Sequence, residues 1–260
     1  MPEYFDIHSH LNFGDLATDL GAVLSRMKEN NIWTTVVGTD EKTSIEAIEL
    51  AEKEEGVFAC IGVHPVDDPL QTFEVSKFES LVSHPKVVAI GECGLDYYRL
   101  EGDMIAEKER QSALFRSQIE FALKHNKALM IHSRSAYDDL ITILGEYKKT
   151  NPELFGNVHF FSGNTEQAIA LAGLGFTLSF AGPITFAREY DDAIRAIPST
   201  MIHAETDSPY ATPVPFRGKR NEPLYVSHIA KKLAEIRGED EDVFKKTLVE
   251  NAFRLFNIRL

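Results

Sequence analysis

Two histidines stand one residue apart in the segment Phe5-Asp6-Ile7-His8-Ser9-His10, near the start of the chain. The apolar residues around them indicate a β-strand, in which side chains at positions i and i+2 point to the same face. His8 and His10 could therefore converge on one ion, and neutral imidazole is the commonest metal ligand in proteins. Alone, the pair is weak evidence for a metal site, because two polar residues in a loop give the same pattern.

Other residues that can bind metal also stand where short apolar runs end. These are His64, Glu92, His132, His159 and Asp207. If the runs are parallel strands of one barrel, their carboxyl ends share a face, and residues far apart in the sequence meet there. Such a set could hold two divalent ions about 3.5–4 Å apart with a hydroxide between them. Glu92, on a strand between the two groups of histidines, is the candidate bridging carboxylate.

The elements that must position these residues alternate along the whole chain. After the first strand, at whose end His8 and His10 stand, apolar runs predict strands at 33–38, 57–63, 87–91, 128–131, 158–161, 176–180 and 201–205. Helical periodicity is found at 16–27, 45–51, 75–82, 105–125, 137–147, 166–172, 191–197, 224–236 and 243–256. The length of 260 residues suits two small domains or one α/β barrel. Uninterrupted alternation favours a (β/α)8 TIM barrel in a single domain, 1–260, with the metal site at the C-terminal strand ends.

The composition limits the class of protein and its location. Two cysteines, Cys60 and Cys93, do not make a disulfide framework, so a reducing cytoplasmic location is expected. No signal peptide is expected at the N-terminus. The uncharged run 167–187 contains three glycines and a proline, and is interpreted as a helix end, a turn and a strand rather than a membrane span. The net charge of −13 repels nucleic acid at long range, but bound metal ions could reverse the sign locally.

Seven motifs, in register over about residues 4–256, resemble the TatD family of metal-dependent deoxyribonucleases, which are amidohydrolase-type barrels. They are His8-Ser-His10, Gly62-Val-His64-Pro65, Gly91-Glu92-Cys-Gly94-Leu-Asp96-Tyr-Tyr98, His132-Ser-Arg134, Val158-His159-Phe-Phe-Ser-Gly163, Glu205-Thr-Asp207-Ser-Pro-Tyr210 and Arg217-Gly-Lys-Arg-Asn-Glu-Pro223. One departure is Phe160, where the family commonly has cysteine, and it is not an assigned ligand. Several amidohydrolases place a carbamylated lysine where this chain has Glu92, which argues against a dihydroorotase-like or phosphotriesterase-like enzyme.

The resemblance implies a set of metal ligands and a reaction. It implies that His8, His10 and Asp207 hold one metal, that His132 and His159 hold the other, and that Glu92 is shared. The implied cofactors are two divalent ions, Mg²⁺, Mn²⁺ or Zn²⁺, and the implied substrate is DNA, cut exonucleolytically on single strands. The metals would lower the pKa of a bound water and neutralise charge on the phosphoryl oxygens.

Further residues are candidates for proton transfer and substrate binding. Asp207 is the candidate general base. His64 could contact the phosphate or the leaving oxygen, or could simply pack beside Pro65. Positive charge is expected on loops near the strand ends, where phosphates would arrive. The positively charged residues are Arg99, Arg134, Arg217, Lys219 and Arg220. For each residue taken singly a solvated surface charge is the favoured interpretation, whereas the cluster from Arg217 to Arg220 could equally contact phosphate. Tyr97 and Tyr98 could stack on a base, or could pack at the barrel rim.

Two other functions fit the same residues. The hydroxide could attack an ester or amide bond, such as an aminoacyl linkage on tRNA. A non-catalytic metal-binding or scaffold protein is disfavoured, because structural metal sites usually close with four ligands, whereas six candidate ligands and several loops gather here. No membrane partner and no obligate protein partner are inferred.

Overall fold

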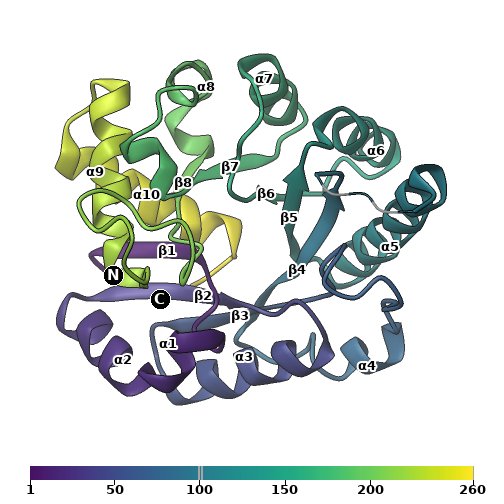
Figure 1. Ribbon diagram of the computed structural model, residues 1–260, viewed down its shortest axis with the longest axis horizontal. Coiled ribbons are helices and arrows are strands. Elements are labelled where there is room, and N and C mark those ends of the chain that lie inside the picture. Colours follow the sequence, from purple (N-terminus) through teal and green to yellow (C-terminus); the bar gives the residue numbers. More distant parts are fainter. Residues whose placement is uncertain (99, 101, 260) are drawn as a thin grey trace.

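Eight parallel strands form one sheet whose spatial order follows the sequence order, from β1 to β8. The computed structural model describes residues 1–98, 100 and 102–259. The strands are β1 (Tyr4–Ser9), β2 (Ile32–Val37), β3 (Val57–Ile61), β4 (Val87–Asp96), β5 (Ala128–Arg134), β6 (Gly156–Val158), β7 (Thr177–Phe180) and β8 (Ile202–Ala204). They surround a central axis, with the helices outside the ring (Figure 1). The predicted (β/α)8 barrel is confirmed.

Helices follow the strands and cover the barrel. They are α1 (Gly14–Thr18), α2 (Leu20–Glu29), α3 (Glu41–Lys53), α4 (Val75–Glu79), α5 (Met104–His125), α6 (Tyr137–Thr150), α7 (Thr165–Gly173), α8 (Asp191–Ala196), α9 (Val226–Arg237) and α10 (Glu241–Leu255). Short 3-10 turns lie at Gly182–Thr185, Ser199–Met201 and Pro223–Tyr225. None of the helices in the described part of the chain combines the length and the apolar character that crossing a bilayer requires.

The bounds of several elements differ from the sequence-based expectation, and three of these differences are described here. The helix expected at 16–27 is divided into α1 and α2 at Asp19. β4 continues to Asp96, because its glycines let it approach β5 closely instead of ending the strand. β6 ends at Val158, earlier than expected, because Phe160 adopts a left-handed conformation with φ of 45°. Its backbone N–H donates to Glu205 Oε1 at 2.5 Å, so it joins the site and not the strand ladder.

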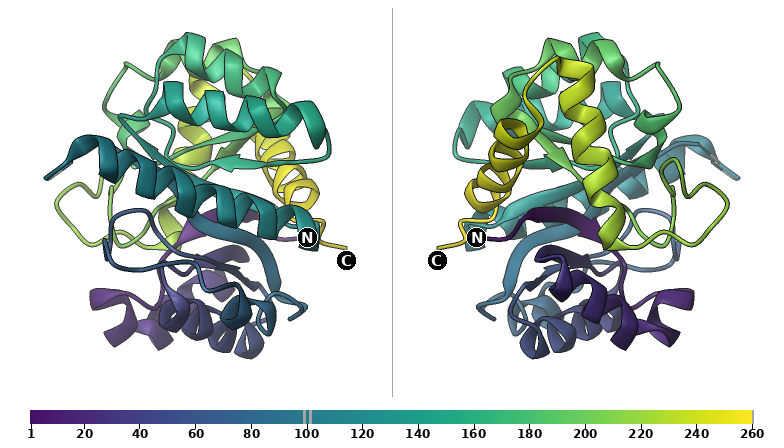
Figure 2. Two further views of the ribbon diagram at one scale, coloured as in Figure 1. Left: turned by 90° about the vertical axis from the view of Figure 1, so that its right-hand side faces the viewer. Right: turned by 90° about the vertical axis from the view of Figure 1, so that its left-hand side faces the viewer.

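An aromatic cluster packs at the N-terminal ends of the first three strands. Phe5, Trp33 and Phe58 are each the second residue of their strand. The rings of Trp33 and Phe58 lie 5.8 Å apart, and Phe253 on α10 stacks on Trp33 at 5.6 Å. Figure 2 shows α10 lying beside β1, so the last helix of the chain supports the first strand. The apolar core at this end leaves the C-terminal strand ends for polar side chains.

The barrel closes between β1 and the segment that follows β8. His10 N–H donates to the carbonyl of Ser208 at 2.8 Å, and Asp207 N–H donates to the carbonyl of His8 at 2.9 Å. Ser9 and Ser208 form a parallel bridge. The backbone hydrogen bonds that join the two ends of the sheet therefore come from His8, His10 and Asp207, which are three of the predicted metal ligands.

Candidate metal centre

The six predicted metal ligands come together at one point, around the Glu92 carboxylate. Its Oε2 lies 3.5 Å from His8 Nε2 and 3.6 Å from His10 Nε2. Its Oε1 lies 2.8 Å from His159 Nε2 and 2.9 Å from His132 Nδ1. One carboxylate oxygen thus faces the histidines of β1, and the other faces the histidines at the ends of β5 and β6.

Asp207 completes the group on the β1 side. Its Oδ1 lies 3.5 Å from His10 Nε2 and 3.7 Å from His8 Nε2, and the two Nε2 atoms lie 3.2 Å apart. Two imidazole nitrogens and two carboxylate oxygens therefore point at a common centre. Imidazole and carboxylate are the donor types that Zn²⁺ accepts, and carboxylates also suit Mn²⁺ and Mg²⁺. The donor set fits a divalent cation.

A glycine on β4 allows Glu92 and His132 to meet. Gly94 pairs with His132 in the sheet register and has φ of +143°, which L side chains rarely adopt. A Cβ atom there would lie 2.0 Å from the carbonyl oxygen of His132. Only glycine permits this approach of β4 to β5, which places Glu92 among the histidines.

The surroundings favour the metal-binding protonation state of two of the ligands, Glu92 and His8, whereas neighbouring carboxylates raise the pKa of His10 and of His132. Burial tends to raise the pKa of Glu92, but the imidazoles of His159 and His64 outweigh it and hold that pKa well below its usual value. Burial lowers the pKa of His8, and His159 lowers it further. Glu92 is therefore ionised and His8 keeps a nitrogen lone pair, which are the forms that a metal ion requires.

Residues behind the ligands fix the orientation of their rings. His132 Nε2 lies 3.0 Å from Asp96 Oδ2, while its other nitrogen faces Glu92. His10 Nδ1 lies 2.9 Å from the carbonyl oxygen of Val37, which leaves Nε2 for the centre. Such partners set the tautomer of a metal-binding histidine. The sequence analysis gave Asp96 no role. Asp96 follows Glu92 by four positions on one strand, so the alternation of side chains along a strand could have placed both on the same face.

A third carboxylate lies on the far side of His159. Glu205 Oε1 is 3.7 Å from His159 Nδ1, and its Oε2 accepts a hydrogen bond from Ser179 Oγ at 2.7 Å. Glu205 and the carboxylate of Glu92 raise the pKa of His159 well above its usual value, against the opposing effect of burial. The position of Glu205, two residues before Asp207, was the sequence signal that could have placed this carboxylate at the site.

His64 lies in the same group of side chains, next to Glu92 and over the cavity. Its Nε2 lies 3.6 Å from Glu92 Oε1, and its Nδ1 lies 2.6 Å from Asp67 Oδ1. Both His64 and Asp67 line the cavity over the centre. Asp67 was missed because it lies in a loop without periodicity, and no sequence pattern links it to His64.

The cavity above the centre has a volume of about 610 Å³. Arg134 lines it, as expected for a substrate contact, and so do Phe160 and Tyr210. The other predicted cations differ in their surroundings. Arg217 stacks on the ring of Phe186 at 3.9 Å, and Lys219 lies 5.9 Å from the ring of Phe216. Arg220 forms an ion pair with Asp19 at 2.7 Å. None of these three cations is among the described residues that line this cavity. Arg99 lies outside the described residues.

Two polar residues that the sequence left without a role are buried in the fold. His203 on β8 is fully buried, and neither ring nitrogen has a hydrogen-bond partner in the described part of the chain. Burial lowers its pKa to about 3. Cys93 is also fully buried, with its thiol near the carbonyl oxygens of Ile90 and Met130. Neither side chain lines the cavity.

Comparison with known proteins gives consistent matches over nearly the whole chain. The model of a family described as TatD related DNase matches residues 5–257. YabD of Bacillus subtilis, named an uncharacterized metal-dependent hydrolase, is 40% identical over 98% of this chain and 99% of its own length. YcfH of Escherichia coli, named likewise, is 35% identical over 97% of this chain and 95% of its own. The crystal structure of YJJV, a TatD homologue from Escherichia coli, superposes with a TM-score of 0.89 at 29% identity and covers 99% of both chains.

Proposed function

We propose, from the premise that this chain belongs to the TatD family of metal-dependent hydrolases, that it hydrolyses phosphodiester bonds of DNA and acts as an exonuclease on single strands. The observation that carries the proposal is the position of Glu92. Each oxygen of its carboxylate faces a different pair of histidines, as a carboxylate shared by two cations would. Two-metal sites are a recurrent solution for cleaving phosphodiesters.

The proposed ligands divide into two groups around this carboxylate. His8, His10 and Asp207 would hold one cation, and His132 and His159 the other, with Glu92 shared. Bound Mg²⁺, Mn²⁺ or Zn²⁺ would supply a water of lowered pKa and positive charge for the phosphoryl oxygens. Asp96 and the carbonyl of Val37 hold the ring orientations that this requires.

Asp207 and His64 are the candidates for moving protons. The Asp207 side chain is 15% exposed and lines the cavity, so it can accept a proton from the attacking water. His64 points Nε2 toward the centre, because Asp67 holds Nδ1 on the other side of the ring. This arrangement directs His64 at the phosphate or at the leaving oxygen.

Arg134 is the best-placed substrate contact. It lines the cavity over the centre, and its planar guanidinium suits bidentate binding of a phosphate. Arg217, Lys219 and Arg220 lie on the loop between β8 and α9, outside the lining of this cavity. We predict that these three cations contact a part of the DNA strand that lies beyond the cleaved bond.

The test is an assay of single-stranded DNA labelled at the 5′ or the 3′ end, with Mg²⁺, Mn²⁺ and Zn²⁺ titrated after chelation. Stepwise shortening from one end, and two metal ions per chain by elemental analysis, are expected. Glu92→Ala should abolish turnover and reduce metal content, while the variant remains folded in chelator at a lower melting temperature, because a buried carboxylate that its neighbouring imidazoles stabilise is lost. Glu250→Gln, an exposed carboxylate on α10, is the matched control.

Other outcomes would contradict the proposal. Turnover that survives both chelation and Glu92→Ala would remove the metal centre from the reaction. Hydrolysis of an aminoacyl ester with intact DNA would favour the ester or amide alternative. Unfolding of the protein on metal removal, without any hydrolysis beforehand, would indicate a structural site.

A further inference from the structure

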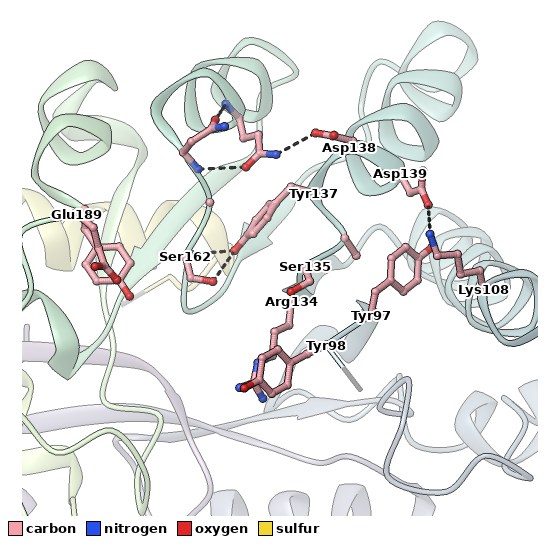
Figure 3. A pocket seen from close by; sticks show the side chains of 15 residues that line it. Tyr97, Tyr98, Lys108, Arg134, Ser135, Tyr137, Asp138, Asp139, Ser162 and Glu189 are labelled. Carbon is pink, nitrogen blue, oxygen red and sulfur yellow. Dashed lines mark hydrogen bonds and ion pairs between the residues drawn. The ribbon is translucent and has the colours of Figure 1, made fainter. Parts of the chain in front are cut away.

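A second cavity of about 790 Å³ adjoins the metal centre. We call it the tyrosine hollow and define it by Tyr97, Tyr98, Tyr137 and Tyr190, whose side chains line it between the ends of β4 and α8. Figure 3 shows Tyr97, Tyr98 and Tyr137 around this space. Its volume lies in the range of pockets that hold small organic ligands.

The hollow adjoins the cavity over the metal centre, and Arg134, Ser162 and Tyr190 line both spaces. A strand whose scissile phosphate lay at the centre would therefore have the hollow beside it. Tyr137 is buried beneath Ser162, whose backbone N–H donates to the Tyr137 hydroxyl at 2.8 Å. This bond stabilises the boundary between the two cavities.

An aromatic ring and a cation lie together at the junction. The guanidinium of Arg134 stands over the ring of Tyr98, 3.7 Å from its centroid, as Figure 3 shows. Tyr98 is nevertheless 50% exposed, so part of the ring can contact a ligand. Aromatic rings of this kind bind nucleobases by stacking, without regard to sequence.

The outer part of the hollow carries negative charge. Three carboxylates line it, from Asp138, Asp139 and Glu189, against two cations. Asp139 is partly compensated by Lys108, whose Nζ lies 4.0 Å away, and Asp138 accepts a hydrogen bond from Gln167 at 2.9 Å. Figure 3 shows Asp138 and Asp139 on one side and Glu189 on another.

Two phenols of the hollow, those of Tyr97 and Tyr190, are neutral. Burial and the neighbouring carboxylate of Glu189 raise the pKa of Tyr190 to about 12. Burial and Asp139 have the same effect on Tyr97, whose pKa also rises to about 12. Both hydroxyl groups therefore stay protonated at neutral pH and contribute no charge of their own. The hollow offers aromatic faces and hydroxyl groups to an uncharged ligand, and carboxylates that repel an anion.

We propose that the tyrosine hollow receives the terminal nucleoside of a single-stranded substrate and discriminates against an end that carries a phosphate. The proposal rests on the proposed function, because it needs the scissile phosphate at the metal centre. A nucleoside with a free hydroxyl is uncharged and fits the aromatic lining. A terminal phosphate carries between one and two negative charges at neutral pH and would lie near Asp138 and Glu189. A strand that continued through the hollow would bring a phosphate to the same carboxylates.

The experiment compares oligothymidylates that end in a hydroxyl or a phosphate, at the 3′ end and at the 5′ end, with the metal-loaded enzyme. At the end that the enzyme attacks, the hydroxyl form should have a kcat/KM about tenfold higher. The double variant Asp138→Asn, Glu189→Gln should bring this ratio close to one, because it removes the two charges that repel a terminal phosphate. The asparagine can still accept the hydrogen bond from Gln167, so the local structure is kept. Asp242→Asn with Glu250→Gln, the same charge change on α10, should keep the wild-type ratio.

Tyr98→Ala tests the aromatic contact and should raise KM for the oligonucleotides by roughly tenfold. Two further measurements separate this proposal from the proposed function. Hydrolysis of bis(p-nitrophenyl) phosphate, which has no nucleoside, reports the metal centre alone in the wild type. Equilibrium binding of phosphorothioate oligothymidylates, which resist cleavage, gives the ratio of affinities for the two kinds of end even if no substrate is hydrolysed.

The possible outcomes are distinct. No hydrolysis of any phosphodiester would overturn the proposed function, and the binding ratio would still decide the role of the hollow. Equal kcat/KM and equal affinity for the two ends would overturn the role of the hollow. A preference that is unchanged in the Asp138→Asn, Glu189→Gln variant would do the same.

Discussion

The backbone N–H of Asp207 donates a hydrogen bond to the carbonyl of His8 at 2.9 Å, while the Asp207 side chain points at the imidazole of the same histidine. The main chain of this residue closes the barrel, and its side chain enters the candidate metal centre. Asp207 also has a positive φ of 52°, which aspartate tolerates better than most residues. Barrel closure and the position of one proposed ligand therefore depend on the same short segment.

We predict that barrel closure and metal binding can be separated by substituting two neighbouring residues of this segment. Asp207→Asn keeps the backbone bond and should lower kcat by about a hundredfold or more, with a melting temperature close to the wild-type value. Thr206→Val should instead destabilise the fold by roughly 1–3 kcal/mol, because it removes the 2.6 Å hydrogen bond from Thr206 Oγ1 to the buried Asp6. Steady-state kinetics and urea unfolding of both variants check this. A large loss of stability in Asp207→Asn would contradict it.

Asp96 should control metal affinity without touching the metal. Asp96→Asn replaces the acceptor beside His132 Nε2, so the ring loses its fixed tautomer and orientation. Metal affinity is expected to fall about 10–100-fold, as for other second partners of metal-binding histidines. Titration of the chelated protein with Mn²⁺ or Zn²⁺ measures this directly. Excess metal should restore most of the activity, whereas a loss that metal cannot rescue would show that Asp96 acts in another way.

Gly94 is predicted to be irreplaceable for steric reasons. Gly94→Ala would set a Cβ 2.0 Å from the carbonyl oxygen of His132, at a φ of +143°, and so should separate β4 from β5 or prevent folding. Gly145→Ala is the matched control, because Gly145 lies inside α6 and a Cβ there meets nothing within 4 Å. The control should stabilise the protein by about 0.5–1 kcal/mol. Thermal and urea unfolding distinguish the two results.

His203 should make the fold less stable in acid. Burial lowers its pKa in the folded protein to about 3, whereas the unfolded chain has the ordinary value of about 6.5. Above pH 6.5 both states are neutral at this position and it has no effect. Below that pH the unfolded state binds the proton first, so stability falls by roughly 1.4 kcal/mol for each pH unit down to the folded pKa.

The measurement is urea unfolding of the wild type and His203→Leu at pH 7 and pH 5. The wild type should lose about 2 kcal/mol more than the variant between these two values. Leucine suits the site because neither ring nitrogen of His203 has a partner in the described residues. Equal pH dependence in the two proteins would show that folding does not lower the pKa of His203.

The sequence by itself determined the architecture and named the six candidate ligands that the fold brings together. Alternation of apolar and amphipathic stretches predicted all eight strands, and the two-residue spacing of His8 and His10 predicted their common face. Both follow from local rules of side-chain direction, which need no knowledge of distant contacts. The ends of the elements were less well predicted. The strand expected at 87–91 continues to Asp96, because its glycines allow a close approach to β5 that depends on the partner strand.

Only the tertiary structure decided how these residues face each other. The sequence placed Glu92 at a strand end, but its two oxygens are assigned to different histidine pairs by the approach of β4 to β5. The pairing of Asp67 with His64, and the hollow beside Arg134, depend on loops packed across the barrel mouth. Loop conformation has no periodic pattern in the sequence, since it follows from contacts with distant segments, and this is why these features appear only in the folded chain.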